Sequence, residues 1–210
     1  MRSKLSNIFG IGKRGELKIK WMLYSDAAVF APPCVGKEKS KPIISYANMN
    51  GSVYLLEPDE NGYRIRWKYD LNSKEEKIQQ LFDSQASNGI LARPIICDIN
   101  EDGRSEVIFG DEHGKLTCIT TQGKTLWQFS ANGPVRSSPL IADINKDKKP
   151  EIVFGSSDKK LYALNSHGKM LWSFQASSEI EAPAAFIKNK IIFGTNDGTI
   201  YCLSQASQIL

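Results

Sequence analysis

Histidine and cysteine, the side chains that most often build catalytic and metal centres, are scarce in this sequence. Its 210 residues include two histidines and four cysteines, and no pair of cysteines has a C-x-x-C spacing. The common zinc and redox motifs are therefore excluded. The cysteines stand in apolar, strand-like stretches, and we expect them to be reduced, buried thiols that pack as small hydrophobic groups: Cys34, Cys97, Cys118 and Cys202.

The sequence also lacks the short motifs of common enzyme folds. It contains no G-x-S-x-G, no P-loop and no H-E-x-x-H. His113 and His167 each precede a glycine in a predicted turn, and nothing pairs them with a nucleophile. We therefore expect a protein that is not an enzyme. A hydrolase or lyase site assembled from scattered residues stays open as the alternative, because no motif would reveal it.

Long apolar segments are missing as well. No run approaches the roughly 20 apolar residues that cross a bilayer. The N-terminal apolar patch is short and is interrupted by glycines and by Lys13 and Arg14, so it lacks the longer apolar segment of a secretory signal. The sequence predicts a cytoplasmic protein with no membrane partner.

The charge balance gives little information about partners. The net charge of +4 is too small to indicate nucleic-acid binding by itself. Residues 1–20 are locally basic, with Glu16 as their single acid, and could contact phosphates or an acidic partner. A solvated N-terminal segment is the simpler interpretation. Its basic residues are Arg2, Lys4, Lys13, Arg14, Lys18 and Lys20.

A repeat of 45 residues organises what is present. The segment LARPIICDINEDGRSEVIFGDEHGKLTCITTQGKTLWQF aligns without a gap with RSSPLIADINKDKKPEIVFGSSDKKLYALNSHGKMLWSF. Pro94 falls on Pro139 and Trp127 falls on Trp172. Further copies begin near Pro33 and Pro183. A period of about 20–50 residues indicates a solenoid or a propeller.

Each repeat has the pattern of a β-meander. One unit contains four short strand-like runs, PIICD, EVIFG, KLTCIT and TLWQF, with turn pairs at His113-Gly114 and Gln122-Gly123. Such a unit is typical of a propeller blade, and its faces must be covered by neighbouring copies. We predict an all-β, single-domain β-propeller with four-stranded antiparallel blades at about residues 28–70, 90–130, 135–175 and 180–205.

The fourth repeat lacks a tryptophan strand, and the N-terminal segment resembles the missing piece. RGELKIKWMLYSDAAVFAPP aligns with HGKMLWSFQASSEIEAPAA, which places Trp21 in the column of Trp172. We predict that residues 15–24 form the strand that closes the last blade, since closure removes exposed sheet edges. Closure within one chain is favoured because its ends have a high effective concentration. The alternative is an eight-bladed ring of two chains that exchange these strands.

One insertion interrupts the period. Between Trp67 and Pro94 the chain has about 15 residues more than the corresponding segment of the next repeat. Ser73 and Glu76 form a capping box, which predicts a helix over about residues 74–86. This helix is either a lid on the propeller or a docking element for a protein partner. Its apolar face contains Ile78, Leu81 and Phe82.

The repeat carries a family resemblance. The pattern P-x-h-x-D-h-N-x-D-G-x-x-E-h-h-h-G, with h apolar, resembles the FG-GAP/VCBS repeat of β-propellers. The following G-K-L-x-C-h and G-K-x-L-W-x-F are similar to the quinoprotein (PQQ)-like propeller repeat. The resemblance implies a propeller fold and does not specify a function. Quinoprotein enzymes need a larger propeller and a bound quinone, and no segment here matches their active site.

The FG-GAP resemblance implies calcium binding, because calcium prefers about six to eight oxygen ligands. The implied ligands in the second blade are Asp98, Asn100, Asp102 and Glu106. A weaker set in the third blade, where Lys148 replaces the glycine, is Asp143, Asn145, Asp147 and Glu151. The alternative is a turn held by hydrogen bonds from backbone to side chain, with Glu106 facing solvent.

These observations favour a non-catalytic binding or scaffold module that mediates protein–protein interaction, alone or within a larger complex. One alternative is a calcium-binding adhesion module of the FG-GAP type. A weaker alternative is an enzyme or carbohydrate-binding propeller that uses the central channel.

Overall fold

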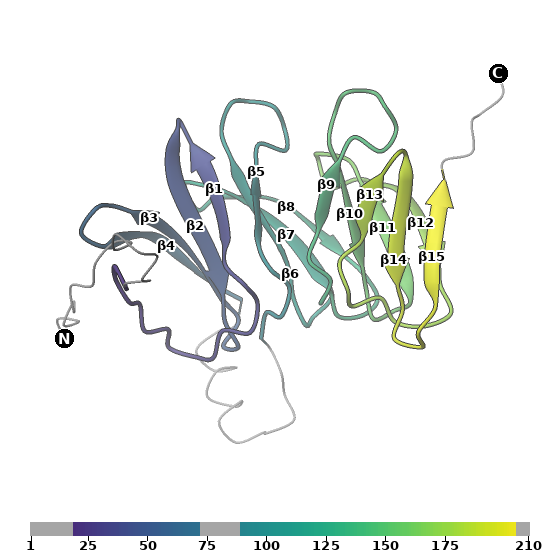
Figure 1. The fold of residues 1–210 in the computed structure, drawn as a ribbon, viewed down its shortest axis with the longest axis horizontal. Helices are drawn as coiled ribbons and strands as arrows, with labels where there is room; N and C mark the ends of the chain where they lie inside the picture. The colour runs from purple at the N-terminus through teal and green to yellow at the C-terminus, as the bar shows by residue number, and fades with distance from the viewer. Residues whose placement is uncertain (1–18, 72–88, 205–210) are drawn as a thin grey trace, which may run out of the picture.

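The described chain consists of β-strands, turns and irregular connections (Figure 1). The computed structural model describes residues 19–71 and 89–204. Within these ranges no helix is long and apolar enough to cross a membrane. The strands of the described residues form four antiparallel sheets, which we call blades 1 to 4 in chain order.

The strands of each blade pair in chain order, so that every blade is a meander. Blade 1 consists of β1 (Cys34–Glu38), β2 (Lys41–Ala47), β3 (Ser52–Pro58) and β4 (Tyr63–Asp70). Blade 2 consists of β5 (Ile95–Cys97), β6 (Glu106–Gly110), β7 (Lys115–Thr120) and β8 (Thr125–Ser130). Blade 3 consists of β9 (Leu140–Ala142), β10 (Glu151–Gly155), β11 (Lys160–Leu164) and β12 (Met170–Gln175). Blade 4 contains three strands among the described residues: β13 (Ala185–Ile187), β14 (Lys190–Gly194) and β15 (Ile200–Ser204).

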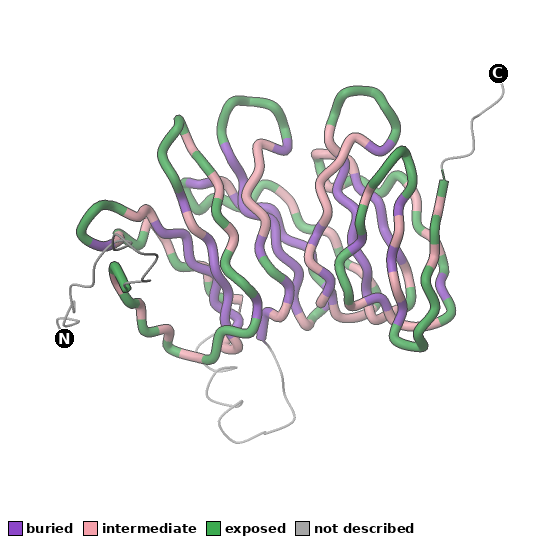
Figure 2. Tube along the Cα trace, viewed as in Figure 1, coloured by how far each residue is buried: buried purple, intermediate pink, exposed green. Residues whose placement is uncertain are grey.

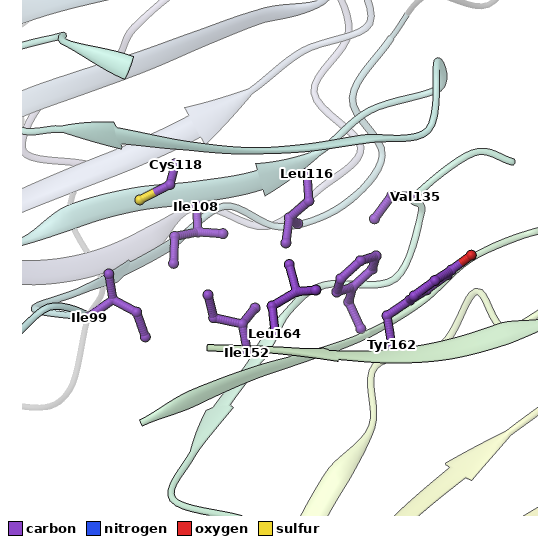
Figure 3. Packing of buried hydrophobic residues seen from close by; sticks show 9 residues of the cluster. Ile99, Ile108, Leu116, Cys118, Val135, Ile152, Tyr162 and Leu164 are labelled. Atoms are coloured by element: carbon purple, nitrogen blue, oxygen red, sulfur yellow. The ribbon is translucent and has the colours of Figure 1, made fainter. Parts of the chain in front are cut away.

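Three apolar cores lie between successive blades and hold them together. The core between blades 2 and 3 contains Ile108 and Leu116 from one side and Ile152 and Tyr162 from the other (Figure 3). Burial is concentrated in the second and third strands of blades 1 to 3 (Figure 2). The predicted all-β fold of antiparallel, face-packed sheets is therefore confirmed. The apolar repeat positions point alternately towards the preceding and the following blade, as the period of two in a strand requires.

Tryptophan side chains connect neighbouring blades. Trp67 Nε1 of blade 1 donates a hydrogen bond to the Thr121 carbonyl of blade 2 at 3.1 Å. Trp127 Nε1 of blade 2 donates in the same way to the Ser166 carbonyl of blade 3 at 2.9 Å. The tryptophans are thus anchors between blades, each with an apolar body and one polar atom that finds a partner.

Residues 19–24, the described part of the predicted closing strand, do not pair with blade 4 of the same chain. Blades 1 and 4 lie at opposite ends of the array (Figure 1). Residues 19–24 form no strand, and Trp21 instead packs against Tyr63 of blade 1, with ring centroids 5.1 Å apart. The predicted pairing with the last blade is therefore wrong for these residues, because four blades leave the two ends of the array far apart. The rest of the predicted strand, residues 15–18, lies outside the described residues.

The predicted helix and the predicted burial of the cysteines have different outcomes. The helix over 74–86, with Ile78, Leu81 and Phe82, lies outside the described residues. All four cysteines are free, and Cys118 is buried as expected. Cys202 is exposed, which corrects the prediction, because no blade formed by the described residues covers the outer face of blade 4.

Candidate functional site

The two acidic loops are closed by hydrogen bonds from their own backbone. In the loop of blade 2, the Asp98 carboxylate accepts N–H bonds from Asp102 at 3.1 Å and from Gly103 at 2.8 Å. The Asn100 side-chain oxygen also accepts from the Asp102 N–H, at 3.0 Å. Asp102 accepts from the Arg104 N–H at 2.8 Å. These are Asx-type turns, which need no ion to hold their shape.

The loop of blade 3 repeats this arrangement. Asp143 accepts N–H bonds from Lys146 at 2.7 Å and from Lys148 at 3.0 Å. The Asn145 oxygen accepts from the Asp147 N–H at 2.8 Å. Lys148 has a φ of 72°, close to the 83° of Gly103 at the equivalent position. The lysine therefore adopts the glycine conformation, at a cost in backbone strain.

The glutamates of the two loops are buried, so the expectation that Glu106 faces solvent is wrong. Glu106 is 1% exposed, and its carboxylate accepts the Ile99 N–H at 3.1 Å. Glu151 is 2% exposed and accepts the Ile144 N–H at 2.8 Å. Burial raises the pKa of Glu106 to about 7, despite the lowering effect of the Ile99 hydrogen bond. Each glutamate is the first residue of the second strand of its blade and fastens the start of the acidic loop to that strand, a role that the apolar context of the sequence did not suggest.

Calcium at these loops stays a prediction. Each of the predicted ligand sets, Asp98, Asn100, Asp102 and Glu106 in blade 2 and Asp143, Asn145, Asp147 and Glu151 in blade 3, is used largely for hydrogen bonds within its loop. Within the described ranges, no group of three or more His, Cys, Asp or Glu residues is arranged to hold a metal ion.

The structure brings together a charged cleft that sequence reasoning missed. It has a volume of about 440 Å³ and lies at the junction of blades 1 and 2, on the side of the first hairpins. Its cations come from four separate segments, the turn after β1, the start of β2, strand β4 and the acidic loop of blade 2. The lining residues are Glu38, Lys39, Lys41, Ile43, Glu57, Arg64, Arg66, Arg104 and Gln122.

Part of this charge is neutralised within the cleft. Arg66 forms an ion pair with Glu38 at 2.5 Å, and Arg64 forms one with Glu57. Burial alone would raise the pKa of Glu38, but hydrogen bonds from Thr121 and Arg66 outweigh it, so that the pKa is lowered and the carboxylate stays ionised. The carboxylates of Glu38 and Glu57 thus form ion pairs with arginines and orient them.

The remaining cations have no ion pair among the described residues: Lys39, Lys41 and Arg104. All three are exposed, and Lys39 has a φ of 46° in the tight turn after β1. Glu38 and Glu57 attract Lys39 and Lys41 from beyond ion-pair distance. A cleft with these three cations beside two oriented arginines can still bind carboxylate, sulfate or phosphate groups. The only sequence signal was the lysine-rich run GKEKSK at residues 36–41, which resembles an ordinary solvated turn.

The histidines show no catalytic arrangement in the part of the chain that the structure describes. His113 is exposed in a turn. His167 Nδ1 lies 3.2 Å from Ser166 Oγ, but both residues are on an exposed turn, and no hydrogen bond to a carboxylate of a described residue orients the imidazole. A second cavity of about 320 Å³ lies between blades 3 and 4 and is lined mainly by Trp172, Phe174, Phe186 and Leu203, without a charged group.

Comparison with known families agrees with the repeated, face-packed sheets. A family model described as the lambda-carrageenase β-propeller domain matches residues 75–142 and, a second time, residues 138–210, which together are more than half of the chain. The chain belongs to the lambda-carrageenase β-propeller domain family. The predicted propeller and its repeated blades are thereby confirmed, whereas nothing found supports FG-GAP or VCBS membership. No curated protein sequence matches this family member significantly.

Solved structures share the fold of this carrageenase-family propeller at low sequence identity. BamB from Moraxella catarrhalis is 14% identical with a TM-score of 0.62, covering 89% of this chain and 48% of BamB. BBS1N, solved in complex with ARL6DN, is 10% identical with a TM-score of 0.64, covering 91% of this chain and 56% of its own. The computationally designed Ika4 protein is 14% identical with a TM-score of 0.60, covering 87% of this chain and 94% of Ika4. The chain therefore spans about half the length of BamB and BBS1N, and these likenesses show the fold alone.

Proposed function

We propose that this propeller is a non-catalytic binding module whose cleft between blades 1 and 2 holds an acidic segment of a protein partner. The observation that carries the proposal is the placement of Lys39, Lys41 and Arg104 around one cleft, where none of the three forms an ion pair with a described residue. Such charges would attract an acidic segment at long range and orient it at short range.

The solved neighbours are compatible with a role in protein binding. BBS1N was solved in complex with ARL6DN, so a propeller of similar fold takes part in a protein complex. A propeller fold hosts many functions, and this likeness therefore supports the class of function and no particular partner.

A second candidate ligand for the same cleft is an anionic polysaccharide. The observation that favours it is the family itself, whose name refers to lambda-carrageenase. The cations of the cleft would then bind charged groups of a glycan rather than Asp and Glu side chains. Both candidate ligands bind through their negative charges. They can be distinguished by whether an acidic peptide or an anionic polysaccharide binds more tightly.

Binding of two polyanions tests the proposal. We would measure fluorescence polarisation with a labelled oligoglutamate peptide and with lambda-carrageenan, using neutral dextran as the uncharged control. We expect saturable binding of the peptide that weakens at least tenfold in the Lys39→Glu, Lys41→Glu, Arg104→Glu triple variant and weakens with added salt. The matched control is Lys169→Glu, an exposed lysine in a turn of blade 3.

The outcomes separate the candidates. Tight peptide binding that depends on the three cations supports the protein-binding function, and tighter carrageenan binding with the same dependence replaces it with the polysaccharide. Equal binding by the triple variant and the Lys169→Glu control, or no binding of either polyanion, overturns both.

A further inference from the structure

The outer face of blade 4 exposes positions that are buried in the other repeats. We call this face the tail end; it consists of Ile192, Gly194, Ile200 and Cys202. Ile200 is 77% exposed, whereas Leu116 and Leu161 in the same repeat column are fully buried against the following blade. Cys202 is exposed, and its counterparts Cys118 and Ala163 are fully buried. The tail end therefore has the composition of an interface between blades and no neighbour among the described residues.

The first described residues lie where an outer strand of a preceding blade would lie. In β8 and β12 the tryptophan and the second residue after it face the following blade, in the sequences WQFS and WSFQ. Residues 21–24, WMLY, show the same alternation of half-buried and exposed side chains. Trp21 packs on Tyr63 of blade 1, and Leu23 packs on the apolar cluster of the same blade.

The contacts of Leu23 match those of its repeat counterpart, Phe129. Phe129 packs against Phe154 and Tyr162 of the following blade, two rings that are stacked with centroids 5.3 Å apart. Leu23 packs against the cluster that contains the corresponding stacked pair of blade 1, whose centroids are 4.7 Å apart. That pair is Tyr46 and Tyr54. The segment thus occupies the place of a fourth strand, with no further strand of that sheet among the described residues. At the other end of the array, the described part of blade 4 is a three-stranded sheet.

A second pair of positions shows the same complementarity. Val135 and Ile180 begin their blades, are almost completely buried, and fill the space that the glycine of the preceding blade leaves open. A Cβ added to Gly110 would lie 2.3 Å from Val135, and one added to Gly155 would lie 2.2 Å from Ile180. The N–H groups of Val135 and Ile180 donate to the carbonyls of Asp111 and Ser156 in the preceding blade.

The first and last blades of the array each carry one of the two residues that would make this contact. Val29 occupies the column of Val135 and Ile180, yet it is 41% exposed. Gly194 occupies the column of Gly110 and Gly155, yet a Cβ added there would meet only the Thr199 carbonyl, at 3.9 Å. Val29, which could fill such a space, and the open space over Gly194 are thus both present, at opposite ends of the array.

We propose that two copies of this chain assemble head to tail into one closed ring of eight blades. Residues 19–24 of each copy would pair, as a fourth strand, with the edge of β15 in the other copy that has no strand partner among the described residues. Val29 would pack over Gly194, and its N–H would donate to the Thr195 carbonyl of the other copy. Unpaired strand edges and apolar ends of this kind favour association.

The number of copies is limited by the number of blades, because each copy contributes four sheets. Propellers commonly contain about four to eight blades, which two copies satisfy and three exceed. A head-to-tail contact that closes after two copies leaves no free end.

The oligomeric state of the full chain is the first test. Native mass spectrometry and light scattering should give twice the chain mass of 23.4 kDa at micromolar concentration. Val29→Arg should abolish the dimer by placing a charge at the contact. Gly194→Phe should abolish it by filling the space, while leaving the single chain unstrained because that space is open. The matched control is Leu126→Arg, which changes a side chain of similar exposure, 42%, on an outer strand inside the array.

Mixing the two variants makes the test specific for a head-to-tail contact. Val29→Arg keeps an intact tail end and Gly194→Phe keeps an intact Val29. We expect each to be monomeric alone, and an equimolar mixture to form a one-to-one pair through the single intact interface, with lower affinity than the wild-type ring. A wild-type chain that stays monomeric, a mass of three or more copies, or a Val29→Arg variant that still dimerises would overturn the proposal. So would a mixture of two folded variants that does not pair.

This inference does not rest on the proposed cleft function. The cleft lies between blades 1 and 2 of one chain, so a monomeric Gly194→Phe variant should still bind the polyanion that the wild type binds. Loss of polyanion binding in the triple cleft variant should likewise leave the dimer mass unchanged.

Discussion

The inner and outer blades of this array have nearly the same repeat sequence and very different surroundings. Leu161 of blade 3 is fully buried and Ile200 of blade 4 is 77% exposed, although both are apolar residues of one column. The first hairpins also differ. Blades 2 and 3 carry long acidic loops fastened by a buried glutamate, and blades 1 and 4 carry two-residue turns at Lys39-Ser40 and Lys188-Asn189. The comparison teaches that the sequence of a blade decides which of its side chains are apolar and face a neighbour. Whether those side chains are buried depends on the presence of a neighbouring blade.

The largest expected effect comes from adding a side chain at equivalent glycines. Gly155→Val should destabilise the fold by about 3 kcal/mol or more, because its Cβ would lie 2.6 Å from the Ile180 carbonyl and 2.2 Å from its side chain. Gly194→Val should change the stability of the single chain by less than about 1 kcal/mol, since its surroundings are open. Urea unfolding of dilute protein measures both. Equal destabilisation would contradict the difference between inner and outer blades.

The buried glutamates provide a second comparison, because Glu106 and Glu151 of the inner blades correspond to Ile43 and Lys190 of the outer ones. Burial raises the pKa of Glu106 to about 7 in the folded state, above its value of about 4.5 in the unfolded chain. Its contribution to stability is therefore fully present below pH 4.5 and is lost as the pH rises through 7.

Glu106→Gln removes this pH dependence and keeps an acceptor for the Ile99 N–H. Relative to wild type, the variant should gain about 2 kcal/mol of stability at pH 8 compared with pH 5. Urea unfolding at the two pH values measures the difference, with Glu101→Gln, an exposed glutamate of the same loop, as the control. A relative stability that does not change with pH would show that Glu106 titrates normally.

The two acidic loops differ at one backbone position, which gives a smaller effect. Lys148→Gly should stabilise the protein by about 1 kcal/mol, because Lys148 already has a φ of 72°. Gly103→Lys in the other loop should destabilise it by a similar amount. Thermal unfolding of the two single variants measures this. A loss of stability in Lys148→Gly would mean that the lysine side chain contributes more than its strained backbone costs.

The smallest expected effect is that of calcium. Asp98 and Asp143 already accept two backbone N–H bonds each, so millimolar calcium should leave the melting temperature unchanged within about 1 °C. A calcium-dependent rise that disappears in Asp98→Asn and persists in Asp143→Asn would instead establish the blade 2 loop as a calcium site. Magnesium at the same concentration is the control for ionic strength.

The fold could be predicted because its determinants recur at a fixed period. Pro94 and Pro139, and Trp127 and Trp172, mark the same places in successive blades, and the tight turns between them limit the strands to one arrangement. The propeller architecture and its four repeats were therefore predictable. The sequence left open whether one chain or two would complete a ring, since aligned repeats show which surfaces match and not which copy supplies them.

The candidate site was less predictable than the fold. Lys39 and Arg104 are 65 residues apart in the sequence and meet only because blade 2 packs on blade 1. Glu106 was misjudged because a charged residue is usually exposed, and only the structure shows the Ile99 N–H that it accepts. Properties that repeat along the chain were visible in the sequence, and properties that arise between dissimilar segments were not.

The glycine that receives the first residue of the next blade has a consequence for the history of such chains. In such a repeat, the surface that faces the following blade fits the surface by which every copy faces the preceding one. A duplicated copy therefore packs on its neighbours without any new contact having to evolve. Unequal recombination in steps of one repeat would lengthen or shorten the protein while preserving every junction. The size of a propeller would then be decided by which number of units closes, and selection for binding could act afterwards on the hairpins, where the copies of this chain have already diverged.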